Sequence, residues 1–176
     1  MKLSHPTRVE AHGTKVHPES AARSLTVHYE FPARGQLPPV KLTWYDGGRR
    51  PPHFEQGKLP KWGDGVLFVG SKGMLIADYT KHKLLPEKDF ADFVPPKPFI
   101  PRSIGHYREW VEACKTGGPT TCHFDYAGVL TETVLLGNVA YRTGKPLEWD
   151  AANLRAKNAP EADKYIRKEY RKPWTL

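Results

Sequence analysis

Four side chains of this sequence are of types that bind a sugar-like small molecule: Asp46, Lys61, Trp62 and His106. Charged groups form charge-assisted hydrogen bonds with hydroxyls, and an indole face covers the apolar face of a sugar ring. The first three lie in or beside a long loop rich in glycine and proline, and such loops are usually functional or disordered. The alternatives are that Asp46 only makes a turn, that Trp62 only anchors the loop, and that His106 is a solvated histidine.

Other kinds of active-site chemistry are not indicated. The pair Cys122-His123 is too isolated for a zinc site, and no other histidines or cysteines have metal-ligand spacing. Ser71 and Ser103 lack the strand-turn-helix setting of a nucleophile elbow. Cys114 and Cys122 lie outside any CxxC motif, so we expect two buried or partly buried thiols and no disulfide or metal role.

Composition limits the partners. The chain has 176 residues, 39% hydrophobic and 26% charged, which suffices for one packed domain. Its net charge of +8 would suit a polyanion, but the densest basic stretch, 164–172, is interleaved with acidic residues as on a solvated helix face. We therefore expect no nucleic-acid partner. Without a long apolar run or a signal-peptide core, we expect a soluble protein with no membrane partner, and we favour the cytoplasm.

The first half of the sequence has the period of β-strands. In the segment 24–31 the odd-numbered residues are apolar and the even-numbered ones polar, so one face packs on a core and the other is wet or meets a partner. Similar patterns recur at 8–12 and 40–45. Two apolar arms within 65–79 flank a glycine-bounded turn, which predicts a hairpin buried on both faces.

The second half is helical and follows a proline-rich connector, 86–101. A first helix, capped by Ser103 and ended by Gly117, carries one apolar stripe. The members of this stripe are Tyr107, Trp110, Val111 and Cys114. A second helix, from about Asp125 to Arg142, is expected to face inward through Ala127, Leu130, Val134, Leu135 and Tyr141. A short strand at 147–149 follows, and Asn158 is positioned to cap a last helix over 159–170.

These elements predict an α+β fold with an open, mostly antiparallel β-sheet and helices packed on one face. We expect a single domain over residues 1–176, in which about 158–176 form a helical tail.

The sequence resembles a known family over essentially its whole length and in the right order. The matching stretches are His5–Ala11, Trp44–Gly48 with Pro51-Pro52, Gly65–Gly73, His106–Cys114, Phe124–Ala127, Leu135–Ala140 and Arg142–Asp150. They resemble the C-terminal domain of the bacterial Gfo/Idh/MocA oxidoreductases.

The resemblance implies the substrate-recognition and oligomerisation domain of an NAD(P)-dependent sugar or polyol oxidoreductase. Family members use their open sheet to form dimers or tetramers, and one end of this domain closes over a sugar-like substrate. NAD or NADP would lie on a separate Rossmann domain. The implied partners are thus a second copy through the sheet face, a sugar-like small molecule and a Rossmann-domain partner.

The sequence departs from the family in what it lacks. No GxGxxG follows an early strand, and the Glu-Lys-Pro motif beside the cofactor is absent. The family's Asp-x-x-x-His pair usually precedes the stretch that matches His5–Ala11, and this chain begins four residues before His5. We therefore expect no cofactor and no catalytic residue in this chain, and whether it is an enzyme stays open.

Two other functions remain open. One is a free-standing carbohydrate-active enzyme on the same fold, such as a lyase or isomerase. The other is a basic interaction module. An oxidoreductase needs a base for the hydroxyl proton and a cofactor at hydride distance, so an upstream strand followed by GxGxxG would favour the first hypothesis over both.

Overall fold

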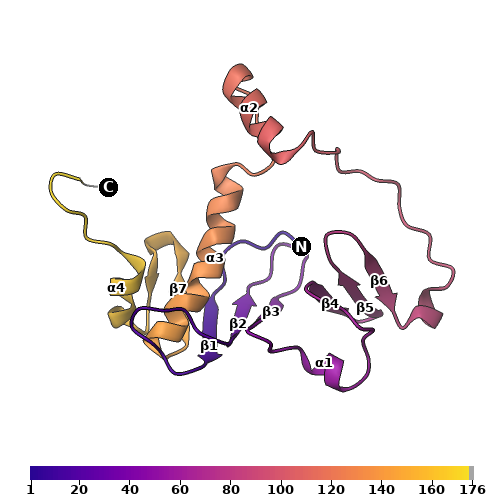
Figure 1. Ribbon diagram of the computed structural model, residues 1–176, viewed down its shortest axis with the longest axis horizontal. Helices are drawn as coiled ribbons and strands as arrows, with labels where there is room; N and C mark the ends of the chain where they lie inside the picture. Colours follow the sequence, from indigo (N-terminus) through magenta and orange to yellow (C-terminus); the bar gives the residue numbers. More distant parts are fainter. Residues whose placement is uncertain (175–176) are drawn as a thin grey trace. The chain divides into compact units, whose positions relative to one another are not determined.

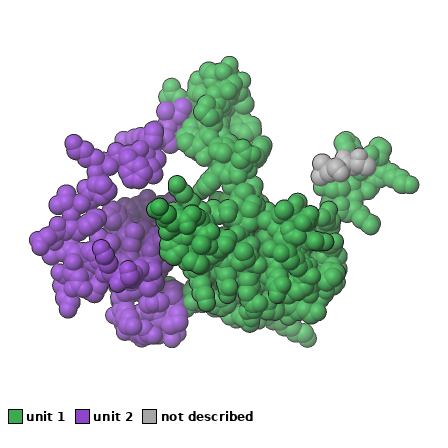
Figure 2. Space-filling view, turned by 180° about the vertical axis from the view of Figure 1, so that it is seen from behind, with its two compact units in different colours: residues 1–50, 107–176 green, residues 51–106 purple. Residues whose placement is uncertain are grey.

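A computed structural model describes residues 1–174, and its contacts divide the chain into two compact units (Figure 2). Unit 1 comprises Met1–Arg50 and Tyr107–Leu176, and unit 2 comprises Pro51–His106. The sequence had predicted a single domain. Unit 2 packs around a small core of its own, made of Trp62, Ile76 and Leu85, and this separates it from the larger core of unit 1.

Unit 1 is built on a five-stranded sheet with the order β3-β2-β1-β7-β8. The strands are β1 (Arg8–Gly13), β2 (Leu25–Phe31), β3 (Val40–Asp46), β7 (Leu147–Asp150) and β8 (Arg155–Ala156). Every neighbouring pair is antiparallel. The predicted α+β class with open antiparallel sheets is therefore confirmed.

The core of unit 1 lies between this sheet and the C-terminal half of α3 (Phe124–Thr143) (Figure 1). The apolar side chains predicted for β2 are buried, and they meet the helix residues Leu136, Gly137, Val139, Ala140 and Tyr141. A β-carbon on Gly137 would lie 2.6 Å from Oη of Tyr29 and 3.1 Å from a methyl of Val27. Glycine at this position lets the helix backbone approach the sheet closely.

The N-terminal half of α3 and the preceding helix α2 (His106–Thr116) differ from expectation. Leu130, Val134 and Leu135 of α3 are exposed, and only Tyr141 of the named bulky residues is buried. The stripe of α2 is exposed as well, and so are both cysteines, so the prediction of buried thiols was wrong. The reason is that no described element of unit 1 packs extensively against α2 or along the first turns of α3.

The C-terminal region is less helical than predicted. Its described helices are η2 (Ala151–Asn153), η3 (Pro160–Ala162) and α4 (Asp163–Ile166), and residues 175–176 of the predicted tail lie outside the described part. Asn158 does not cap a helix. Its Oδ1 accepts from the backbone N of Glu148, and its Nδ2 donates to the carbonyl of Pro146, each at 2.9 Å, so this side chain fastens the tail to β7.

Unit 2 contains a three-stranded antiparallel sheet, β4 (Val66–Gly70), β5 (Gly73–Ala77) and β6 (His82–Leu85). Two short helices flank it, α1 (Pro52–Glu55) and η1 (Glu87–Phe90). The predicted hairpin is present, but Val66, Phe68 and Val69 are exposed, so burial on both faces was wrong. A sheet of three short strands with one small core buries only one face.

Among the helices of residues 1–174, none has the combination of length and apolar character that crossing a membrane requires.

Candidate functional site

Asp46 ends β3 and makes the turn that follows it. Its Oδ1 accepts a 2.6 Å hydrogen bond from the backbone N of Gly47. Gly47 has a φ of +65°, and a β-carbon there would collide with the Arg23 carbonyl oxygen, so only glycine fits. Arg49, just beyond, donates to the hydroxyls of Ser24 and Thr26 at 3.2 Å and thereby holds the turn against β2. These contacts explain the conformation of the Asp-Gly-Gly turn without a ligand.

Lys61 and Trp62 belong to unit 2 and have opposite environments. Lys61 is exposed, whereas Trp62 is 9% exposed and packs with Ile76 and Leu85. The Nζ of Lys81 lies 4.3 Å from the centre of the Trp62 ring, a cation–π distance. The indole is thus the centre of a small core, which is the role of a loop anchor.

His106 is the first residue of α2 and is exposed. It belongs to unit 2 together with Lys61 and Trp62, whereas Asp46 belongs to unit 1. Within unit 2, the exposed members of the predicted set are Lys61 and His106.

The face of the unit 1 sheet opposite α3 carries a grid of polar and charged side chains. Paired residues in antiparallel strands share a face. The register places Glu148, Arg8, Glu30 and Lys41 in one row across β7, β1, β2 and β3. The next row is Glu10, His28 and Thr43, and the third is His12, Thr26 and Tyr45.

Contacts within this face hold its side chains in place. The guanidinium of Arg8 donates to Oε2 of Glu10 at 2.9 Å, and Nε2 of His12 lies 3.2 Å from Oε1 of the same carboxylate. The hydrogen bond from Arg8, with the charges of Arg8 and His12, lowers the pKa of Glu10 below its ordinary value against the opposing effect of burial. His28 makes a 3.1 Å hydrogen bond with Thr43 Oγ1 on the neighbouring strand.

A second polar cluster joins the N-terminal segment to α3 and β7, and sequence reasoning missed it. Oε1 of Glu132 accepts from Nε1 of Trp149 at 2.7 Å and lies 2.8 Å from Nδ1 of His5. Because a carboxylate has no proton to donate, Nδ1 of His5 carries the hydrogen and Nε2 points away from the pair. Carboxylate-oriented imidazoles of this kind can act as general bases. His5 and Glu132 are 127 residues apart, so no local motif signals the pair.

Unit 1 also exposes a large apolar surface on α2 and the N-terminal half of α3, which we call the helix face. Its aromatic members are Tyr107, Trp110, Phe124 and Tyr126, with exposed fractions of 85%, 63%, 84% and 58%. Its aliphatic members are Val111, Leu130, Val134 and Leu135. Figure 1 shows α2 beyond the N-terminal end of α3. Exposed apolar side chains in this number are typical of interaction sites.

No group of three or more histidine, cysteine, aspartate and glutamate side chains within residues 1–174 is arranged to hold a metal ion. Comparison with protein-family models gives no match, and comparison with curated proteins gives no significant relative.

Proposed function

We propose that this chain is the substrate-recognition and oligomerisation domain of an NAD(P)-dependent sugar or polyol oxidoreductase of the Gfo/Idh/MocA type, acting with a separate nucleotide-binding domain. The observation that carries the proposal is the five-stranded antiparallel sheet that α3 covers on one face only. This is the architecture that the sequence resemblance implies. The uncovered face suits contact with a second copy, because a broad flat surface can meet itself about a two-fold axis.

The helix face supports a second part of the proposal, docking of the nucleotide-binding domain. Covered aromatic side chains bury about 150–250 Å² each, so Tyr107, Trp110, Phe124 and Tyr126 together offer several hundred Å². The aliphatic side chains of α3 add to this area. The total side-chain area that these residues could bury approaches the roughly 800 Å² per partner of a standard protein–protein interface. A surface of this size and apolar character fits another folded domain better than a small sugar.

We assign sugar recognition to two residues of unit 2 that the sequence singled out. Lys61 and His106 are its exposed donors. Trp62 contributes by holding the loop that carries Lys61, because its ring is packed in the core of unit 2 beneath Lys81.

Calorimetric titration tests the recognition part of the proposal. We expect myo-inositol, glucose or glucuronate to bind weakly, and Lys61→Ala or His106→Ala to weaken binding further, whereas Lys72→Ala in the exposed β4–β5 turn has no effect. We expect no tight binding of NAD or NADP, because the glycine-rich turn that holds a pyrophosphate at a helix N-terminus is missing from the sequence. A dissociation constant for NAD in the low micromolar range would contradict the proposal.

The His5–Glu132 pair favours a second candidate, a free-standing lyase or isomerase that uses His5 as its base. Under this alternative the chain alone would turn over a sugar acid or ketose, and His5→Gln would abolish turnover while the protein stayed folded. Absence of turnover over the same set of sugars is the result that the leading proposal predicts.

A further inference from the structure

We infer that the open face of the unit 1 sheet carries a binding site for an oxyanion, the carboxylate or phosphate group of a small polar molecule, centred on the guanidinium of Arg49. The observation that carries this inference is an arginine that two hydroxyls hold in place. The site lies in unit 1, apart from the residues of unit 2 proposed for sugar recognition. It does not depend on the proposed oxidoreductase role.

Arg49 follows the turn after β3 and reaches back over β2. Its Nε donates to Oγ of Ser24 and its Nη1 to Oγ1 of Thr26, each at 3.2 Å. These hydroxyls orient the guanidinium but do not neutralise its charge. Within residues 1–174 no carboxylate lies at ion-pair distance from Arg49. The N–H groups left over form a planar fork, the geometry that binds a carboxylate or a phosphate through two hydrogen bonds.

Thr26 is the buried polar residue on which the site is built. It is 9% exposed although it lies on the face opposite α3. The register places His12 beside it on β1 and Tyr45 beside it on β3. Directly opposite residues of antiparallel strands have β-carbons about 4.5–5.5 Å apart. The guanidinium of Arg49, which contacts the Thr26 hydroxyl, therefore lies close to an imidazole and a phenol.

Two further polar groups of this face have hydrogen-bonding capacity left for a ligand. Within the described residues the hydroxyl of Tyr45 makes no hydrogen bond, and His28 uses only Nδ1, which bonds to Oγ1 of Thr43 at 3.1 Å. The ring centroids of His28 and His12 are 6.0 Å apart. While Arg49 binds the oxyanion, Tyr45 and His28 are placed to bind hydroxyls of the same molecule.

The acidic groups near the site do not cancel its positive charge. Glu10 lies on the same face, one row away, but both of its oxygens are engaged. Arg8 donates to Oε2 at 2.9 Å, and Nε2 of His12 lies 3.2 Å from Oε1. Asp46, although close to Arg49 in sequence, has its register position on the opposite face. A site of positive local charge favours an anion over a neutral sugar.

The position of the site on an open face limits its affinity. Water and salt screen an exposed guanidinium, so we expect a dissociation constant in the millimolar range. Self-association through the same face would cover the site. Binding is therefore measured in dilute protein, below the tens of micromolar at which we expect self-association to begin.

A chemical-shift titration tests the site. The ring Hε1 protons of the histidines are followed by NMR at constant pH and ionic strength while glucuronate, glucose 6-phosphate or glucose is added. We expect saturable shifts of His12 and His28 with the two anions and none with neutral glucose. The stronger of the two anions identifies a carboxylate or a phosphate as the preferred group. His12→Gln and His28→Gln assign the two resonances, and the other histidines of the chain are internal controls.

Three variants separate the fork of Arg49 from general charge attraction. Arg49→Gln should raise the dissociation constant about tenfold or more, because hydrogen bonds between charged groups are lost. Tyr45→Phe removes one hydroxyl without changing the charge and should raise it about threefold. Lys41→Gln removes the same charge as Arg49→Gln from an exposed position of the same face, two rows away, and should change it less than about twofold. Circular dichroism establishes that each variant is folded, and Tyr45→Phe carries the test if Arg49→Gln is not.

The outcomes decide between a site and its absence. Selective weakening by Arg49→Gln and Tyr45→Phe supports the site. Shifts confined to His106 overturn it while supporting sugar recognition by unit 2. Equal shifts with glucose, or anion binding that Arg49→Gln leaves unchanged, overturn it as well. Equal weakening by Arg49→Gln and Lys41→Gln would show that the anions respond only to the net charge of the face, which also overturns the site.

Discussion

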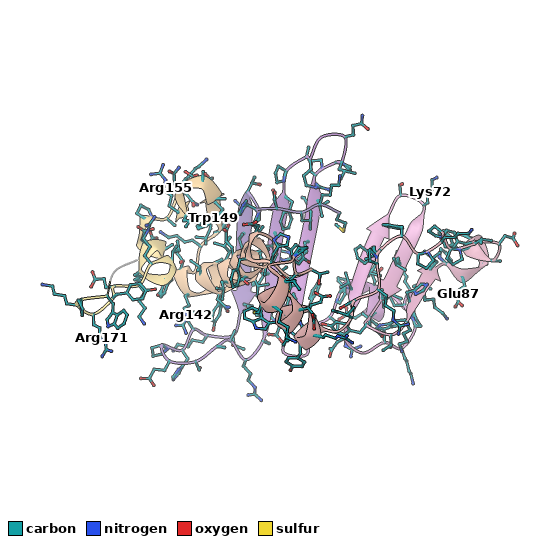
Figure 3. The ribbon with its side chains drawn as sticks, turned by 90° about the horizontal axis from the view of Figure 1, so that it is seen from above. Lys72, Glu87, Arg142, Trp149, Arg155 and Arg171 are labelled. Atoms are coloured by element: carbon teal, nitrogen blue, oxygen red, sulfur yellow. The ribbon has the colours of Figure 1, made fainter. Side chains whose placement is uncertain are left out.

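Nε1 of Trp149, a residue of β7 that Figure 3 labels, donates to Oε1 of Glu132 in α3 at 2.7 Å. The same oxygen also accepts a 2.8 Å hydrogen bond from Nδ1 of His5. One carboxylate of α3 therefore bonds to both the N-terminal segment and the sheet. Trp149 is buried, and the Glu132 side chain is 18% exposed. Loss of this carboxylate would leave a buried indole N–H without its acceptor.

We therefore predict that Glu132→Ala lowers the free energy of unfolding by about 2–4 kcal/mol, because two hydrogen bonds to a charged group are lost. Glu132→Gln keeps an acceptor oxygen and should lower the free energy of unfolding by about half as much. Urea denaturation followed by tryptophan fluorescence measures both values. Glu19→Ala, at an exposed loop position, serves as the control and should change stability by less than about 0.5 kcal/mol. Equal effects at positions 19 and 132 would show that the cluster is not a structural tie.

Two glycines of α3 form a matched pair for testing the helix–sheet contact. A β-carbon on Gly137 would meet Tyr29 and Val27, whereas one on Gly128 would meet no atom within 4 Å. Gly137→Ala should therefore destabilise the fold by about 1–3 kcal/mol through overpacking. Gly128→Ala should stabilise it by about 0.5–1 kcal/mol through helix propensity. Thermal unfolding of the two variants should shift the melting temperature in opposite directions, and shifts of the same sign would contradict the packing described.

The lowered pKa of Glu10 predicts a dependence of stability on acid. In the folded chain the hydrogen bond from Arg8 holds the pKa of Glu10 below the ordinary value of 4.5. The folded state thus binds fewer protons than the unfolded state near that pH, so the stabilisation is complete above about pH 5 and is lost as the pH falls through the folded pKa. Glu10→Gln should lose less stability than the wild type between about pH 5 and pH 3. Urea denaturation midpoints of both proteins at several pH values measure this difference. The same dependence of the midpoint on pH in the wild type and in Glu10→Gln would contradict the prediction.

The alternation of β2 was readable from sequence because a two-residue period fixes which face each side chain occupies. The odd-numbered residues from Leu25 to Phe31 were predicted to face a core, and they do. The register of β1 and β3 against β2, and hence the row of charges, was not readable, because no local pattern states which residues of distant strands pair.

The helices show the limit of the same reasoning. Leu130, Val134 and Leu135 have helical spacing, which indicates an apolar contact but does not say whether the contact lies within the chain. In the structure these residues are exposed. The part of α3 that packs on the core is its C-terminal half, which contains Tyr141. Two of the residues predicted to bind a sugar have the alternative roles that the sequence also allowed. Asp46 makes a turn, and Trp62 anchors a loop.

The mass of the chain in solution tests the central claim, self-assembly through the open sheet face, most directly. We predict that light scattering at physiological ionic strength gives a mass that rises with concentration from 19.9 kDa toward twice that value. The rise should occur over tens to hundreds of micromolar protein, as an interface at the weak end of the specific range requires. A mass of 19.9 kDa that does not change with concentration would contradict the account.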